Sequence, residues 1–177
     1  MCADLEGNLI TGKLNLGPAE GSSWWYSPSA GWRLIDDDIS NTNGPTVAVL
    51  DGAMTLIIGD SSKDYYAYDY APATGEVGPR RVFGAMDDLD ASKPRGIPDG
   101  ATLDDDDGLW CALPGRGELV RFTSTGYDRT IELPFEHPTD VTFGGANLDR
   151  LYVVAINEGL YVIAGVGRGR VEPRAAV

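Results

Sequence analysis

The sequence predicts an all-β fold, a β-propeller built of four-stranded antiparallel blades. The 23 Gly, 11 Pro and 8 Tyr stand among short runs of Val, Ile, Leu and Trp, a composition typical of strands and turns. No window carries the hydrophobic period of a helix. A module of strands and turns recurs about four times at intervals of roughly 40 to 50 residues, the length of a propeller blade.

The length of 177 residues and the hydrophobic content of 42% suit one domain with a single core. A β-sandwich is the alternative fold, but a sandwich needs no repeated turns. Here a turn containing glycine follows the first strand of successive copies and another follows the third. We therefore expect one partial propeller domain over residues 1–177, with its blades at residues 1–36, 43–84, 97–134 and 138–177.

Each expected strand of the first two copies is an apolar or alternating run between turn residues. The first copy lacks an opening strand in this interpretation. Its strands are expected within residues 4–12, at 21–27 and at 32–35, and those of the second copy at 46–50, 55–59, 64–70 and 80–83.

The third and fourth copies follow the same plan. A run of turn residues precedes an apolar strand in the third copy, and a last segment rich in arginine ends the fourth. Strands of the third copy are expected from residue 101, at 109–113, 118–123 and 130–133, and those of the fourth at 141–143, 151–155, 159–163 and around 170–174.

A formal net charge of -13 argues against binding to nucleic acid, which needs clustered Lys and Arg. Divalent cations are the charged partner that this balance favours, although acidity alone also keeps proteins soluble. Cys2 and Cys111 make no disulfide framework, and we expect Cys111 to be buried and both thiols to be free. Without a signal segment or an apolar run of ~20 residues, we expect a cytoplasmic protein that binds no membrane.

Candidate site residues precede the first strand of a copy, because these strands line the channel of a propeller and the loops ahead of them converge at one mouth. Asn43, Asp99 and Asp140 stand at these places. Their oxygens suit Ca²⁺ or Mg²⁺, and a shared cation would bring the side-chain oxygens of Asn43 and Asp99 within about 5 Å of each other. Alternatively, such residues are ordinary turn residues that cap backbone groups.

Short motifs in consistent order over nearly the whole chain carry a resemblance to a known family. They include Asn43-Gly44-Pro45, Gly59-Asp60-Ser61, Ile97-Pro98-Asp99-Gly100, Gly108-Leu109-Trp110, Phe143-Gly144-Gly145 and Leu151-Tyr152-Val153. In these motifs the chain resembles the gluconolactonase, regucalcin (senescence marker protein) and luciferin-regenerating-enzyme superfamily.

The resemblance implies a six-bladed propeller with one divalent metal in its channel, in enzymes that hydrolyse lactones or related esters. Asn43 matches the metal-binding asparagine of this family, and Asp99 matches the aspartate that binds metal and is commonly cast as the catalytic base. The implied cofactor is one divalent ion, Ca²⁺ first and Zn²⁺, Mg²⁺ or Mn²⁺ as alternatives. The implied substrate is a small lactone or a related sugar-acid derivative.

The chain also departs from the family. A metal-binding Glu and an Asn-Asp-Gly substrate motif belong ahead of the segment that matches residues 2–7, so about two amino-terminal blades lack a counterpart. The alternative function is therefore a catalytically silent propeller that binds a cation, a small ligand or a protein. Open blade faces also lead us to expect self-association.

The remaining notable side chains have simpler interpretations. His137 is expected at the surface, and no nucleophile-elbow motif accompanies it. We expect the blade cores to contain Trp24, Trp25, Trp32 and Trp110. We expect residues 36–38 and 104–107 to form solvated turns.

Overall fold

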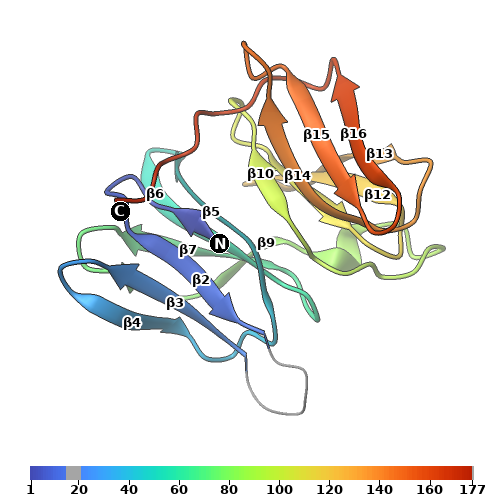
Figure 1. Cartoon of the computed structure of the whole chain (residues 1–177). Helices are drawn as coiled ribbons and strands as arrows, with labels where there is room; N and C mark the ends of the chain where they lie inside the picture. The colour runs from blue at the N-terminus through green and yellow to red at the C-terminus, as the bar shows by residue number, and fades with distance from the viewer. Residues whose placement is uncertain (15–20, 177) are drawn as a thin grey trace.

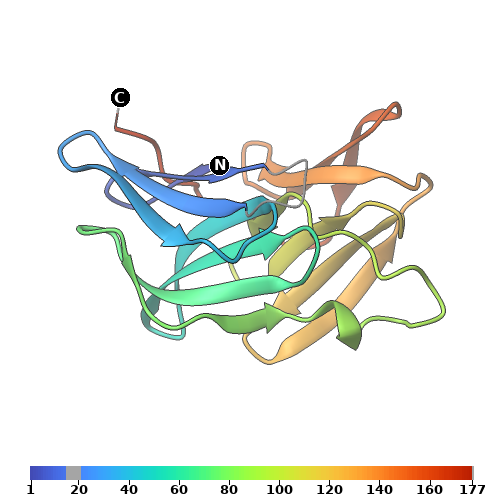
Figure 2. The same cartoon turned by 90° about the horizontal axis from the view of Figure 1, so that it is seen from below.

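The computed structural model describes residues 1–14 and 21–176, and its strands form four antiparallel sheets arranged as the blades of a propeller (Figures 1 and 2). This arrangement confirms the predicted fold class and excludes the β-sandwich. Within the described residues, the helical structure is one 3₁₀ turn, η1 (Met86–Asp88). No helix in that part of the chain is long and apolar enough to cross a membrane.

The first two sheets have their strands in chain order from the inside outward. The first sheet contains β1 (Cys2–Ala3), β2 (Leu9–Lys13), β3 (Ser22–Ser27) and β4 (Gly31–Asp36). The second sheet contains β5 (Thr42–Leu50), β6 (Ala53–Asp60), β7 (Tyr65–Ala71) and β8 (Glu76–Val77), and β9 (Arg81–Gly84) also pairs with β7.

The third and fourth sheets follow the same order. The third contains β10 (Ala101–Leu103), β11 (Leu109–Leu113), β12 (Glu118–Thr123) and β13 (Gly126–Glu132). The fourth contains β14 (Pro138–Gly144), β15 (Arg150–Ala155) and β16 (Gly159–Ala164).

Two expectations about the ends of the chain were wrong. The first sheet has an opening strand, because Cys2 and Ala3 pair with Ile10 and Leu9 of β2. The residues around 170–174 add no strand to the fourth sheet. Instead Gly169 forms an isolated bridge with Asp104 beyond the end of β10, and the chain continues from there toward the first sheet.

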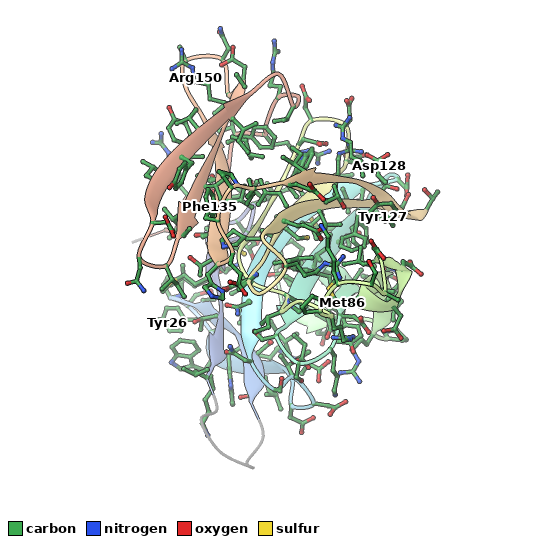
Figure 3. All side chains as sticks on the ribbon, turned by 90° about the vertical axis from the view of Figure 1, so that its right-hand side faces the viewer. Tyr26, Met86, Tyr127, Asp128, Phe135 and Arg150 are labelled. Atoms are coloured by element: carbon green, nitrogen blue, oxygen red, sulfur yellow. The ribbon has the colours of Figure 1, made fainter. Side chains whose placement is uncertain are left out.

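Apolar side chains pack between neighbouring sheets, and the period of two along a strand decides which interface each one enters. Leu109, Cys111 and Leu113 of β11 face the second sheet, whereas Trp110 and Ala112 face the fourth. All five residues of β11 are buried because a sheet covers each of its two faces. Phe135 adds to the interface between the third and fourth sheets because its ring stacks on that of Tyr161, with ring centroids 4.3 Å apart (Figure 3).

The first and fourth sheets each leave one apolar face uncovered. On the fourth sheet Val154 lies opposite Leu160, which is 63% exposed, and Val162 is 51% exposed beside them. On the first sheet Trp32 is 61% exposed and lies 4.8 Å from Tyr26 between ring centroids. The expectation that Trp32 belongs to a blade core was therefore wrong, because no sheet of the described residues packs on that face.

The expectation of a solvated turn at residues 104–107 was wrong for its first residue. Asp104 is buried, and its carboxylate accepts hydrogen bonds from the backbone of Gly108 (2.8 Å), from Trp110 Nε1 (2.9 Å) and from Arg121 Nε (2.7 Å). Arg121 also pairs with Asp128 at 2.8 Å (Figure 3). A run of four aspartates therefore contains one that fixes the turn between β10 and β11.

The cysteine prediction is confirmed, because Cys2 and Cys111 are free and Cys111 is buried in β11. His137 is half exposed, and its nearest carboxylate is that of Glu136, 4.0 Å away.

Candidate functional site

A cavity of about 510 Å³ lies where the innermost strands of the four sheets meet. Its walls come from segments far apart in the sequence, because each sheet contributes its first strand. The lining residues are Met1 to Ala3 and Leu5, Asn43 to Val49, Asp99 to Leu103, Thr139 to Thr142 and Arg170 to Pro173.

Asn43 reaches the cavity from β5, at a point where the strand is irregular. The pairing of β5 with β6 shifts register between Asn43 and Thr46, which is a β-bulge. Gly44 has a φ of 49°, and a Cβ there would lie 2.7 Å from the carbonyl oxygen of Asp99. Glycine therefore permits both the backbone conformation and the close approach of the loop that holds Asp99.

Ser61 links the loops that hold the two predicted site residues. Asn43 Nδ2 donates to Ser61 Oγ at 2.7 Å, and Ser61 Oγ donates to the carbonyl oxygen of Pro98 at 3.1 Å. Because the amide nitrogen is turned to Ser61, the amide oxygen points away from it. Within the described residues, no donor reaches Asn43 Oδ1, so this oxygen is available to a ligand.

The backbone around Asp99 is held by three elements. Asp99 N donates to the carbonyl oxygen of Ala112 at 3.2 Å, and Gly100 N donates to that of Thr139 at 2.9 Å. Tyr65 OH donates to the carbonyl oxygen of Asp99 at 2.8 Å. A carboxylate on such a fixed backbone is well suited to a role that needs a defined position.

Burial, followed by the negative charge of Asp140, raises the pKa of Asp99 to about 7. Asp140 lies on the neighbouring strand β14, and its carboxylate packs against the Cα of Gly100, where a Cβ would collide with it. Asp140 Oδ1 also accepts from the backbone of Val141 at 2.8 Å. Asp140, which was proposed with Asn43 and Asp99 from its place ahead of a strand, lines the same cavity as those two residues.

The donor types on this wall fit a hard divalent cation, because an amide oxygen and a carboxylate are ligands that Ca²⁺ and Mg²⁺ prefer. Within residues 1–14 and 21–176, no group of three or more His, Cys, Asp or Glu is placed to hold a metal ion. The fit therefore rests on Asn43 and Asp99, which line one cavity, with the rest of a coordination shell left to water or substrate.

Sequence reasoning missed the cavity wall formed by Arg170 and Glu172. Arg170 Nε donates to the carbonyl oxygen of Asp104 at 2.8 Å, and Arg170 pairs with the carboxylate of Asp107. Glu172 accepts hydrogen bonds from Thr102 and Thr142. No local pattern indicates these contacts, because the partners lie 30 to 70 residues away along the chain.

A family profile, curated relatives and solved structures match this chain. The profile of the family described as SMP-30/Gluconolactonase/LRE-like region matches residues 1–157. Regucalcin of Macaca fascicularis is 28% identical over 143 residues, which are 80% of this chain and 46% of that protein. Pentonolactonase XacC of Haloferax volcanii is 33% identical over 93 residues, which are 52% of this chain and 30% of that enzyme.

The solved structure of a luciferin-regenerating enzyme matches 99% of this chain with a TM-score of 0.86 and 25% sequence identity, and the match covers 64% of that enzyme. The chain spans about half the length of the curated relatives that it matches.

Proposed function

The chain belongs to the SMP-30/gluconolactonase/LRE-like family, and we propose that it is a hydrolase of lactones or related esters. The observation that carries this proposal is the presence of Asn43 and Asp99 on the wall of one cavity, on loops linked through Ser61. A relative that is 33% identical over 93 residues is named as a pentonolactonase, which supports a small lactone as the substrate class.

Asp99 is proposed as the general base. Its carboxylate accepts a proton from a water molecule while the water oxygen attacks the lactone carbonyl carbon, which gives a tetrahedral intermediate. The ring C–O bond then breaks, and the ring oxygen takes the proton from Asp99 to become the hydroxyl group of the hydroxy acid, which leaves Asp99 ionised again. A base works best when its pKa lies near the working pH, and the pKa of Asp99 in the metal-free protein is about 7. Burial and the neighbouring Asp140 supply that shift, so the cavity wall itself prepares the base.

Asn43 and Asp99 are also the proposed metal ligands, with Ca²⁺ as the expected ion and Zn²⁺, Mg²⁺ or Mn²⁺ as alternatives. A bound cation would supply Lewis-acid polarisation of the substrate carbonyl. The orientation of Asn43 by Ser61 keeps its amide oxygen available for that role.

A catalytically silent propeller that binds a cation, a small ligand or a protein is the second candidate. The observation that favours it is the absence, among the described residues, of a cluster of three or more acidic, His or Cys ligands. In this candidate the cavity binds its ligand without activating water.

We further propose that the blades at residues 1–36, 43–84, 97–134 and 138–177 act as one domain, and that the chain associates with itself through its two uncovered sheet faces. Exposed Leu160, Val162 and Trp32 support association, because contiguous exposed apolar surface marks interaction sites.

Hydrolysis of a panel of aldonolactones and aryl esters tests the enzymatic proposal. The protein is assayed after chelation and after addition of Ca²⁺, Mg²⁺, Mn²⁺ or Zn²⁺. We expect metal-stimulated lactone hydrolysis that Asp99→Asn lowers by about 10²- to 10⁴-fold, the usual range for loss of a general base. Asp51→Asn, in an exposed turn, is the matched control and should keep the parent rate. Failure to hydrolyse any lactone with any of the metals would favour the silent propeller.

A further inference from the structure

The C-terminal segment, residues 165–176, is fixed at one end beside the third and fourth sheets. Gly169 N donates to the carbonyl oxygen of Leu148 at 2.8 Å, and Asp105 N donates to that of Arg168 at 2.8 Å. Arg170 adds its hydrogen bond to the carbonyl oxygen of Asp104. These bonds hold the segment beside the C-terminal end of β10, whereas Asp99 precedes the N-terminal end of that strand.

The other end of the segment is fixed to the first sheet, because Ala176 N donates to the carbonyl oxygen of Gly7 at 2.8 Å. Figure 1 shows the chain, in dark red, running from the fourth sheet past β10 to the C-terminus beside the first sheet. Residues 170–173 line the cavity between the two anchors. The segment is thus a wall of the cavity on the side where neither outer sheet has a neighbour.

Glu172 lies between these anchors and places a carboxylate on the cavity wall. Its Oε1 accepts from Thr102 Oγ1 at 3.3 Å and from Thr142 Oγ1 at 3.4 Å, so two hydroxyl groups of different sheets converge on one carboxylate oxygen. Within the described residues, Oε2 has no hydrogen-bond donor, and Glu172 is exposed to the cavity.

Asp99, Thr102 and Glu172 line the same cavity. Thr102 follows Asp99 by three residues along the inner strand, which is roughly 10 Å of extended chain. A substrate whose carbonyl group lies at Asp99 would therefore extend its hydroxyl groups toward Glu172 and the two threonines. A carboxylate oxygen accepts strong hydrogen bonds from hydroxyl groups and offers nothing favourable to a methylene group.

We propose that Glu172 is a specificity-determining residue that accepts hydrogen bonds from substrate hydroxyl groups and makes the cavity selective for polyhydroxylated lactones over unsubstituted ones, an inference that rests on the proposed function. A site built around a hydroxyl acceptor discriminates strongly, because an analogue without the hydroxyl leaves the acceptor unpaired.

Substrate discrimination tests this role. We expect Glu172→Ala to lower kcat/KM for glucono-δ-lactone about tenfold or more and to change kcat/KM for δ-valerolactone, which has no hydroxyl groups, by less than about twofold. Glu158→Ala, in the exposed turn between β15 and β16, is the matched control and should leave both values unchanged. Equal losses for the two lactones in Glu172→Ala would overturn the proposal.

A second variant separates recognition from support of the wall. The double substitution Thr102→Val and Thr142→Val removes both hydroxyl partners of Glu172 and keeps the carboxylate. We expect this variant to retain most of the preference for the hydroxylated lactone. Loss of the preference as complete as in Glu172→Ala, with Glu172 intact, would show that Glu172 acts only by holding the segment.

A binding measurement keeps the proposal testable if no lactone is hydrolysed. Glucitol is a neutral polyol without an ester bond, so its binding does not require catalysis. By calorimetry we expect the parent to bind glucitol and Glu172→Ala to bind it about tenfold more weakly. Absence of glucitol binding by the parent, or equal binding by the two proteins, would overturn this inference, whereas absence of hydrolysis alone would overturn only the enzymatic function.

Discussion

Asp99 and Asp104 flank the same inner strand, β10, and their surroundings shift their pKa values in opposite directions. Burial and the charge of Asp140 raise the pKa of Asp99 to about 7. Burial also favours the neutral form of Asp104, but hydrogen bonds from Arg121 and from the backbone of Gly108 outweigh it and lower the pKa. Asp99 therefore holds a proton up to near neutral pH, whereas ionised Asp104 stabilises the fold through its hydrogen bonds.

The stability of the metal-free protein should depend on the protonation of Asp99. Its folded pKa is about 7, above the ordinary value of 3.8, so the native state holds a proton that the unfolded chain releases between about pH 4 and pH 7. This group therefore favours folding below that window, and its contribution is lost as the pH rises through it. Asp99→Asn should raise Tm by roughly 5 °C at pH 8 and by much less at pH 5.

Thermal unfolding in the presence of a chelator measures this difference, with Asp51→Asn as the control. The same gain in Tm at both pH values would show that Asp99 does not titrate in the window given.

Asp104→Asn should destabilise the protein by about 3 kcal/mol at pH 7, because it leaves Arg121 buried beside a neutral side chain. The folded pKa of Asp104 is lowered, so its contribution is present above the ordinary carboxyl pKa and is lost as the pH falls below it. Asp106→Asn, at an exposed position of the same turn, is the control. Urea unfolding midpoints measure both, and equal midpoints for the two variants would contradict the prediction.

At the scale of single residues, residue types and turn positions predicted the candidate site residues but not the side chains that surround them. Asn43, Asp99 and Asp140 were proposed from their places ahead of strands, and all three line the cavity. The burial of Asp104 was missed because four consecutive aspartates read as a solvated turn. Its partner Arg121 is 17 residues away, so no local pattern indicates the ion pair.

Among the elements, strand β11 is covered by a neighbouring sheet on each of its two faces. Leu109 is fully buried in the interface with the second sheet, so Leu109→Ala should lower the free energy of unfolding by about 2–5 kcal/mol. Leu160→Ala, on the uncovered face of β16, should change it by less than about 0.5 kcal/mol. Chemical denaturation at concentrations where the chain is monomeric compares them, and similar costs would mean that another part of the chain covers β16.

Strands were predictable wherever alternating or apolar runs stand between turn residues, as in β6, β7 and β11. The two-residue strand β1 was missed because it has no pattern of its own and exists through pairing with β2. The C-terminal segment was expected as a strand of the fourth sheet. Its conformation is set instead by distant partners, of which Asp104 and Gly7 lie far earlier in the chain.

At the scale of the whole molecule, two apolar sheet faces without neighbours should drive association. Burial of apolar surface contributes ~25 cal/mol per Å², so several side chains on each face give a substantial gain. Light scattering at micromolar concentrations should detect species larger than a monomer. The double variant Leu160→Lys and Val162→Lys should reduce them, because it places charge on the uncovered face of the fourth sheet.

Tyr127→Lys, on an exposed position of β13 in the third sheet, is the control and should associate as the parent does (Figure 3). A stable, monodisperse parent monomer would count against the proposed self-association.

The arrangement of the sheets as blades followed from the repeated module, but the closure of the cavity did not. Repeats predict that each sheet packs on the next, because each copy has its own apolar runs. They say nothing about the wall formed by Arg170 and Glu172, which belongs to no repeat. The part of the cavity that we connect with substrate specificity is therefore the part that the repeat pattern leaves undetermined.

The most direct test of a single site at Asn43 and Asp99 is calorimetric titration of Ca²⁺ into the metal-free protein. We expect one ion per chain for the parent, and binding at least about tenfold weaker for both Asn43→Ala and Asp99→Asn, because the first removes an oxygen ligand and the second removes the negative charge of the carboxylate. Asp51→Asn should bind as the parent does. Parent-like Ca²⁺ binding by both site variants would contradict a shared site at these two residues.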